Sequence, residues 1–190
     1  MKRCTWVDVN KPDYVEYHDR EWGVPVRDDA RMFEFLVLET QQAGLSWYTV
    51  LQKRENYRKA FAAFDMHKIA RFGDAKIEKL MTNPGLIRNR AKLKATVANA
   101  RAALEVCEEF ESLCDYFWGF VGDKPRNNRF RRMEDCPTTS EVSDMLSKDM
   151  KRRGFKFVGS TTIYAHMQAT GMVNDHLLGC YRRREIIGAG

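Results

Sequence analysis

The chain of 190 residues lacks any long apolar run. No stretch approaches the ~18 consecutive apolar residues that a membrane helix needs. Residues 1–13 also lack the apolar core of a secretory signal peptide. We therefore expect a cytoplasmic protein with no membrane partner. Hydrophobic residues still make up 44% of the chain, so a folded core is expected rather than wholesale disorder.

Cysteine is scarce and odd in number, and the five are Cys4, Cys107, Cys114, Cys136 and Cys180. An odd count without an export signal argues against a disulfide framework. Buried free thiols or metal ligands are the interpretations that remain.

Alternating strand patterns are also missing, whereas helical periodicity runs through most of the chain. The sequence therefore predicts an all-α fold of eight or nine helices. The expected helices span 28–43, 47–64, 88–108, 111–121, 140–154 and 160–171, with two shorter ones beginning at Asp65 and Asp74. Residues 122–137 read as an irregular loop. No repeat or low-complexity linker divides the chain, so we expect one unit over residues 1–190.

A turn at Asn83–Arg88 separates two of these helices. Gly85 could take a positive φ and, with Pro84 and Leu86, bring backbone N–H groups to an external anion. Basic residues follow from Arg88 onward, with no acidic residue before Arg101, and the net charge is +6. This pattern is typical of a clamp for DNA phosphates. The alternative is a plain αα-hairpin with a solvated basic face.

Two cysteine–histidine pairs lie near opposite ends of the chain, Cys4 with His18 and His176 with Cys180. The spacing of the second pair, i and i+4, places both side chains on one helical face. Two sulfurs and two imidazoles can form a closed tetrahedral zinc site, which would be structural because no position is left for water. The alternative is two satisfied histidines and two buried thiols.

Glu39 is an acid on an otherwise apolar helix face that it shares with Phe35, Leu36 and Ala43. A carboxylate there is either a satisfied buried acid or a functional one. Aromatic residues are frequent in the early chain, namely Trp6, Tyr14, Tyr17, Trp22 and Trp47. Aromatic faces stack on flipped bases and attract cations, although core packing is the commoner role.

Four segments together resemble a known family, the DNA-3-methyladenine glycosylases I. They are 14–25 (YVEYHDREWGVP), 38–47 (LETQQAGLSW), 154–159 (GFKFVG) and 171–176 (GMVNDH). The resemblance runs from Cys4 to Cys180. It implies a helix-hairpin-helix glycosylase fold, with a helical core near 28–171 and a hairpin near 83–90. It also implies one structural zinc on Cys4, His18, His176 and Cys180, which joins segments 1–27 and 172–190.

The resemblance further implies an enzyme of base-excision repair that hydrolyses the N-glycosidic bond of 3-methyladenine in double-stranded DNA. Glu39, Tyr17 and Trp47 would line the base pocket, with Tyr14, Trp6 and Trp22 around them. The hairpin residues Pro84, Gly85, Leu86 and Arg88 would hold the DNA backbone, and Gly44 would approach the gap left by the flipped base. Ile87 replaces the second glycine of the usual hairpin.

Most glycosylases with this hairpin carry a catalytic aspartate about twenty residues after it, yet no aspartate occurs between Leu86 and Cys114. The family itself is unusual in lacking that residue. Methylation makes the adenine cationic and already weakens its bond to the sugar. The motifs hold no obvious lysine nucleophile, so we expect a monofunctional enzyme that leaves an abasic site. We also expect the enzyme to be a monomer. The rival interpretations are a catalytically silent DNA-binding module and a zinc hydrolase.

Overall fold

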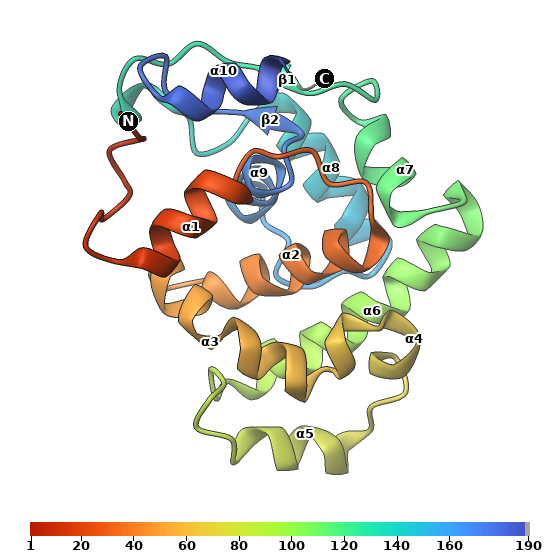
Figure 1. Cartoon of the computed structure of the whole chain (residues 1–190). Helices are drawn as coiled ribbons and strands as arrows, with labels where there is room; N and C mark the ends of the chain where they lie inside the picture. The colour runs from red at the N-terminus through yellow and green to blue at the C-terminus, as the bar shows by residue number, and fades with distance from the viewer. Residues whose placement is uncertain (189–190) are drawn as a thin grey trace.

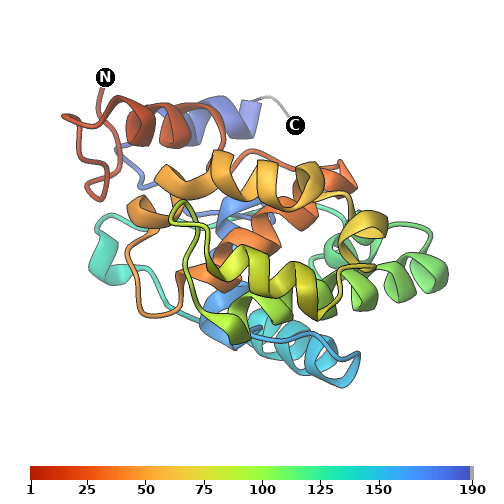
Figure 2. The same cartoon turned by 90° about the horizontal axis from the view of Figure 1, so that it is seen from below.

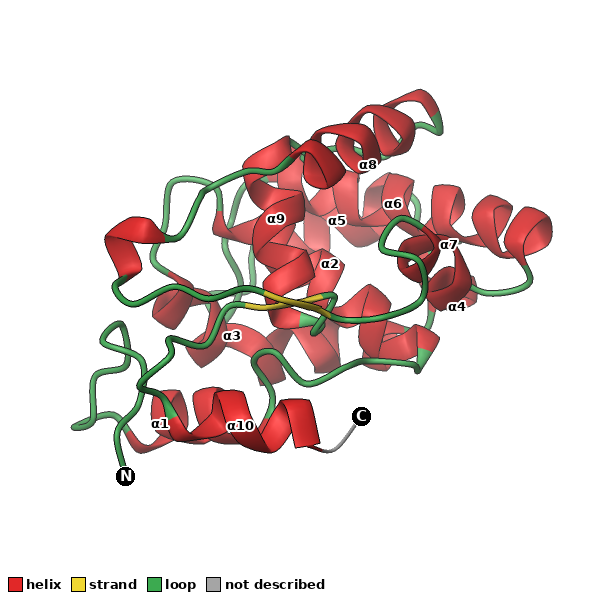
Figure 3. Cartoon of the chain, turned by 90° about the horizontal axis from the view of Figure 1, so that it is seen from above, coloured by secondary structure: helices red, strands yellow, loops and turns green. Residues whose placement is uncertain are grey.

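The computed structural model describes residues 1–188, and the last two residues of the expected C-terminal segment lie outside the described residues. This part of the chain is mostly helical, which confirms the predicted class (Figures 1 and 3). Its α-helices are α1 (Pro12–Arg20), α2 (Asp29–Gln42), α3 (Trp47–Ala60), α4 (Met66–Ile69), α5 (Asp74–Met81), α6 (Arg90–Phe110), α7 (Leu113–Gly119), α8 (Glu141–Arg152), α9 (Ser160–Ala169) and α10 (Tyr181–Gly188).

The helix that carries Glu39 lies at the centre of the fold (Figure 1). All residues of α2 from Met32 to Gln41 are buried, and α2 contacts α3, α6, α7 and α9. Such a helix holds its side chains rigidly, because neighbours pack against it on every face. The fold therefore fixes the position of Glu39 more tightly than a surface helix would.

The predicted caps set the ends of α2 and α3. Asp28 accepts a hydrogen bond from the Arg31 N–H at the start of α2, and Ser46 accepts one from the Thr49 N–H at the start of α3. Each satisfies a backbone donor that has no partner within its helix. After α2 the chain turns at Gly44, whose φ is +77°, as the sequence predicted for a helix stop.

Several predicted boundaries were wrong. The helix expected to reach Phe64 ends at Ala60, because Ala62, Ala63 and Phe64 all have positive φ. A two-residue parallel pair, β1 (Arg126–Asn127) with β2 (Val173–Asn174), also breaks the expectation of no strands. The sequence did not reveal either feature. The strand pair is too short to show alternation, and the left-handed turn after α3 contains no glycine.

The structure adds two helices that we did not predict, α1 and α10. Pro12 at the first position of α1 suits a helix start, because its ring fixes φ and a first-turn N–H has no intrahelical partner anyway. The total within residues 1–188 is therefore ten α-helices rather than eight or nine. None of the helices described is long and apolar enough to cross a membrane.

The two ends of the described chain are joined on one side of the molecule. The Tyr181 N–H donates to the carbonyl of Lys2 at 3.0 Å. A small apolar cluster lies beside this contact and is separate from the main core between the central helices. It combines residues from both ends with residues of α2 and α9, including Cys4, Tyr17, Trp22, Phe35, Ala169, Leu177 and Cys180.

Candidate active site and metal cluster

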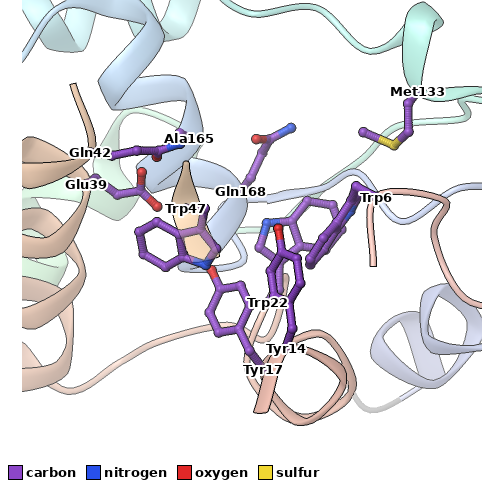
Figure 4. A pocket seen from close by; sticks show the side chains of 10 residues that line it. All are labelled: Trp6, Tyr14, Tyr17, Trp22, Glu39, Gln42, Trp47, Met133, Ala165 and Gln168. Atoms are coloured by element: carbon purple, nitrogen blue, oxygen red, sulfur yellow. The ribbon is translucent and has the colours of Figure 1, made fainter. Parts of the chain in front are cut away.

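A cavity of about 200 Å³ opens between α1, α2, α3 and α9. It is smaller than the roughly 300–1,000 Å³ typical of drug-sized ligand sites, so its size suits a single small ring system. All six pocket residues predicted from the sequence line it. The full lining is Trp6, Tyr14, Tyr17, Trp22, Glu39, Gln42, Trp47, Met133, Ala165 and Gln168 (Figure 4).

Separate elements bring the aromatic rings together. Tyr14 and Tyr17 lie on one face of α1, Trp22 follows that helix, and Trp47 is the first residue of α3. The ring centroids of Tyr17 and Trp47 are 5.3 Å apart, and Trp6 lies 5.1 Å from both Tyr14 and Trp22. These tilted and edge-on arrangements are favourable for aromatic pairs. They form electron-rich walls around the cavity.

The carboxylate of Glu39 points into this cavity from α2 (Figure 4). Glu39 is only 4% exposed. Its Oε2 atom has no hydrogen-bond partner within residues 1–188. Burial away from water raises the pKa of Glu39 to about 8. The indole N–H groups of Trp6 and Trp47 are likewise buried and unpartnered in this part of the chain. The pocket therefore contains both acceptor and donor groups without partners, which is typical of a ligand site.

A second hollow of about 240 Å³ also reaches Glu39. It is lined by the loop after α2 and by the first turn of α9, with the residues Glu39, Gln42, Ala43, Gly44, Leu45, Thr161, Thr162 and Ala165. Lys92 of α6 fixes this loop, because its Nζ donates to the carbonyls of Gln41 and Ala43, both at 2.7 Å. Burial lowers the pKa of Lys92, and its two carbonyl partners belong to the end of α2, where a cation is favourable.

Cys4, His18, His176 and Cys180 meet in one buried cluster, which joins the two ends of the chain as predicted. The helical face predicted for His176 and Cys180 was wrong, because both residues lie in the non-helical segment between β2 and α10. Their ligand atoms all lie within 4.8 Å of one another. Each cysteine sulfur lies 3.5 Å from Nδ1 of His176, and the Cys180 sulfur also lies 3.5 Å from Nε2 of His18. Hydrogen bonds from the Cys4 thiol, His176 and His18 lower the pKa of the Cys180 thiol far below its usual value. This cluster could hold a metal ion.

The outward ring nitrogens of both histidines have fixed partners. Nδ1 of His18 lies 2.8 Å from a carboxylate oxygen of Asp19, and Nε2 of His176 lies 2.9 Å from the carbonyl of Trp22. Such partners fix the tautomer of a ligating histidine. Although burial acts to raise it, hydrogen bonds from Arg3 and His18 hold the pKa of Asp19 well below its usual value. Asp19 therefore stays ionised and orients His18.

The turn between α5 and α6 differs from the prediction in its backbone. Gly85 does not have a positive φ, and its N–H donates to the side chain of Asn83 at 2.8 Å. The N–H groups of Leu86 and Ile87 are also used, by the Asn83 carbonyl and by the Tyr57 hydroxyl. A Cβ at this position would lie 2.7 Å from the side chain of Asn56, an exposed side chain that would have to move. The α6 helix begins at Arg90, two residues later than expected.

Four contributors to the site were not predicted. Gln168 and Met133 line the pocket, Asp19 supports His18, and Lys92 anchors the loop after α2. The adjacency of Asp19 to His18 could have indicated its role. Nothing local in the sequence marks the other three, because each reaches the site from a distant part of the chain.

Comparison with known proteins agrees with this geometry. Residues 6–183 match the sequence profile described as methyladenine glycosylase. The chain is 48% identical to DNA-3-methyladenine glycosylase 1 of Escherichia coli (strain K12), over 95% of this chain and 96% of that one. It is 51% identical to DNA-3-methyladenine glycosylase of Haemophilus influenzae (strain ATCC 51907 / DSM 11121 / KW20 / Rd), over 94% and 96% of the two chains.

Solved structures agree as well. A variant of 3-methyladenine DNA glycosylase I in complex with 3-methyladenine superimposes with a TM-score of 0.93 at 36% identity, over 96% of this chain and 98% of that one. The fold is thus that of a 3-methyladenine DNA glycosylase. The chain belongs to the methyladenine glycosylase family.

Proposed function

We propose that this enzyme hydrolyses the N-glycosidic bond of 3-methyladenine in alkylated double-stranded DNA, which releases the free base and leaves an abasic site. The observation that carries the proposal is the unpartnered carboxylate of Glu39 in an aromatic cavity of single-base size. A base inside a duplex cannot reach such a cavity. The nucleotide must therefore flip out of the stack before it binds.

The chemistry of the lesion fits the groups in the pocket. N3-methylation gives the base a fixed positive charge, so a buried carboxylate and electron-rich rings both attract it. Glu39 would accept hydrogen bonds from the adenine amino edge, Trp47 would stack on the base, and Tyr17 would line the methylated edge. Cation–π attraction between the charged base and the rings contributes about 2 kcal/mol to binding when both are removed from water. Normal adenine lacks the charge and gains none of it.

The same charge makes the base a good leaving group, so the protein need not protonate it. The pocket has to hold the flipped nucleotide and keep the developing sugar cation near water. None of the described residues that line the cavity is a lysine, so no amine is placed for a Schiff base. This supports a monofunctional enzyme without strand cleavage.

We assign one structural zinc ion to Cys4, His18, His176 and Cys180. Zn–S bonds of ~2.3 Å and Zn–N bonds of ~2.05 Å in a tetrahedron place sulfur and nitrogen ~3.6 Å apart, close to the 3.5 Å separations found here. Four protein ligands close the site to water, which disfavours a zinc hydrolase. The ion would tie segments 1–27 and 172–190 into one unit with the helical core.

Replacing Asp19 by asparagine is expected to weaken zinc binding about 10–100-fold, because the amide cannot stabilise the His18 ring as a carboxylate does. Competition with a chromogenic chelator measures the affinity. Asp13→Asn, on the exposed side of the same helix, is the control that should retain wild-type affinity. Equal affinity in both variants would show that Asp19 does not support the ligand.

We place the DNA backbone along the turn at Pro84, Gly85, Leu86 and Arg88, as the helix-hairpin-helix. Because the N–H groups of residues 85–87 already have partners, the support for this placement comes from exposed Arg88 and from the start of α6. Gly44 borders the hollow that leads to Glu39, where it would face the gap in the stack. We take the enzyme to act as a cytoplasmic monomer.

Chromatography of the bases released from methylated duplex DNA tests the function directly. The wild-type chain is expected to release 3-methyladenine, and Trp47→Ala to release it at least tenfold more slowly, because stacking on an aromatic ring contributes about 1–3 kcal/mol per base. If the folded wild-type chain binds duplex DNA but releases no methylated base, it is a silent DNA-binding module.

A further inference from the structure

The segment between α8 and α9 presents an aromatic side chain in an unfavourable backbone conformation. Phe157 has a φ of +59° and is 41% exposed. The left-handed region disfavours bulky L-residues, and such strain persists only where surrounding contacts enforce it. An exposed phenylalanine contributes little to the core, so folding alone gives no reason to keep one here.

Buried polar side chains hold this segment in place. The fully buried Asn99 accepts from the N–H of Lys156 at 2.7 Å and donates to its carbonyl at 3.1 Å. The Ser147 hydroxyl donates to the carbonyl of Val158 at 2.6 Å. Phe155 and Val158 are themselves buried. The backbone is thus clamped on both sides of Phe157, and residues 156 and 157 are left facing outward.

Phe157 and Lys156 border a depression of about 410 Å³ on the surface of α6. The remaining lining residues, all on α6, are Ala91, Lys94, Ala95 and Ala98. In Figure 2 the segment after α8 passes beside the first half of α6. Lys156 has no acidic partner within residues 1–188, whereas Lys94 pairs with Asp74 at 2.8 Å. The surface therefore combines a small-residue floor, an aromatic edge and a free cation.

This depression lies between the two parts of the protein that we assign to DNA. Ala91 is in the first turn of α6, directly after the hairpin turn. Phe157 is three residues before α9, and Thr161 and Thr162 of α9 line the hollow that reaches Glu39. A DNA strand that runs from the hairpin to a nucleotide flipped toward Glu39 would therefore cross this surface.

We propose that Phe157 and Lys156 form a further DNA contact, in which Phe157 packs against the sugar and base edges of the strand that crosses this surface and Lys156 binds a phosphate. The proposal rests on the proposed function for the course of the DNA. Apolar side chains that enter a duplex groove and cations that bind the backbone are the usual components of such a surface. Charge complementarity favours DNA as the occupant, because Lys156 forms no ion pair with any acidic residue within residues 1–188.

Phe157→Gly separates a DNA contact from a structural role. Glycine relieves the left-handed strain, so the melting temperature of the variant should equal or exceed that of the wild type. Fluorescence anisotropy on undamaged duplex DNA should nevertheless show about tenfold weaker binding. Phe157→Ala should lose the same affinity. Met145→Ala, at an exposed apolar residue on α8, is the control that should bind as the wild type does.

Lys156→Gln tests the phosphate contact separately. The slope of log K against log salt should become shallower by about 0.9, as for the loss of one phosphate neutralised. If Phe157→Gly binds with wild-type affinity, the apolar contact of Phe157 is refuted. If Lys156→Gln leaves the salt slope unchanged, the phosphate contact of Lys156 is refuted. These measurements use undamaged DNA. The two proposals can fail separately. If the wild-type chain releases no 3-methyladenine but the variants still bind DNA more weakly than it does, the proposed function is refuted and this contact stands.

Discussion

Glu39→Gln is expected to slow the release of 3-methyladenine on the order of a hundredfold, comparable to the loss of one preorganised electrostatic contact in an active site. Glutamine keeps the size of the side chain but removes the negative charge that complements the cationic base. Because no other carboxylate lines the cavity among the described residues, no neighbour can replace it. Single-turnover base release from methylated duplex DNA measures the effect.

The pH dependence of the wild type should report the same group. The pKa of Glu39 is about 8 in the free protein, so the neutral acid dominates at pH 7, whereas the carboxylate is the form that attracts the lesion. The value of kcat/KM should therefore rise with pH and level off above about pH 8. The cation favours ionisation once bound, so kcat should level off at lower pH. The glutamine variant should lack the rise.

The same substitution should stabilise the fold. A carboxyl group whose pKa rises from 4.5 to about 8 on folding keeps its proton in the native state while the unfolded chain loses it. The free energy of unfolding thus falls as pH rises between these values, by about 5 kcal/mol in all. Glu39→Gln should be more stable than the wild type at pH 8.5 and lose most of that advantage at pH 5, as thermal unfolding would show.

Glu105→Gln is the matched control for these measurements. Glu105 lies about twenty residues after the hairpin, and its side chain is exposed on α6. Its replacement should change neither the rate nor the melting temperature. A wild-type rate and pH profile in Glu39→Gln would show that the acid has no part in recognition.

Removal of the zinc ion that we assign to Cys4, His18, His176 and Cys180 is expected to lower the melting temperature by roughly 10 °C or more and to abolish base release. Two of the ligands adjoin pocket residues: Cys4 is two residues before Trp6, and His18 directly follows Tyr17. His176 also bonds the carbonyl of Trp22. Loss of the ion leaves buried ligands uncompensated, and structural zinc sites contribute several kcal/mol or more to folding. The walls of the cavity should therefore separate when the ion leaves.

The zinc-free protein can be obtained in two ways, by the substitution Cys180→Ser and by treatment with a strong chelator. Elemental analysis should find one zinc per wild-type chain and little in the variant, and tryptophan fluorescence should change with the loss. Cys107→Ser, a partly buried thiol outside the cluster, should keep both metal and activity. A chain that stays folded, active and equally stable without zinc would refute the assignment.

Much of the site was predicted because four segments resemble a known family, whereas local signals drew attention to single residues and left their roles open. An acid on an apolar helix face, such as Glu39, is rare enough to attract attention. The pair His176 and Cys180 attracted attention by its i, i+4 spacing, although both residues lie outside the helices, between β2 and α10. The caps Asp28 and Ser46 act within one turn, so they set the starts of α2 and α3 as predicted.

The features that were missed depend on contacts between distant residues. Lys92 reads as one more cation of a basic helix, yet it bonds carbonyls some fifty positions earlier. Tertiary packing decides the role of Lys92. By contrast, the N–H of Gly85 is occupied by the side chain of Asn83, only two residues earlier. The prediction for Gly85 failed for a different reason, because it considered the freedom of glycine and overlooked the nearby Asn83 side chain.

The joining of the two chain ends at Cys4, His18, His176 and Cys180 has a consequence for synthesis. The ribosome releases the N-terminal segment first, so Trp6, Tyr14 and Tyr17 emerge long before His176 and Cys180. The helical core can begin to fold meanwhile, since much of it is formed by neighbouring helices. The base pocket cannot be completed until the last ligands leave the exit tunnel. A nascent or truncated chain would therefore be inert toward DNA bases, and activity would begin only with the finished protein.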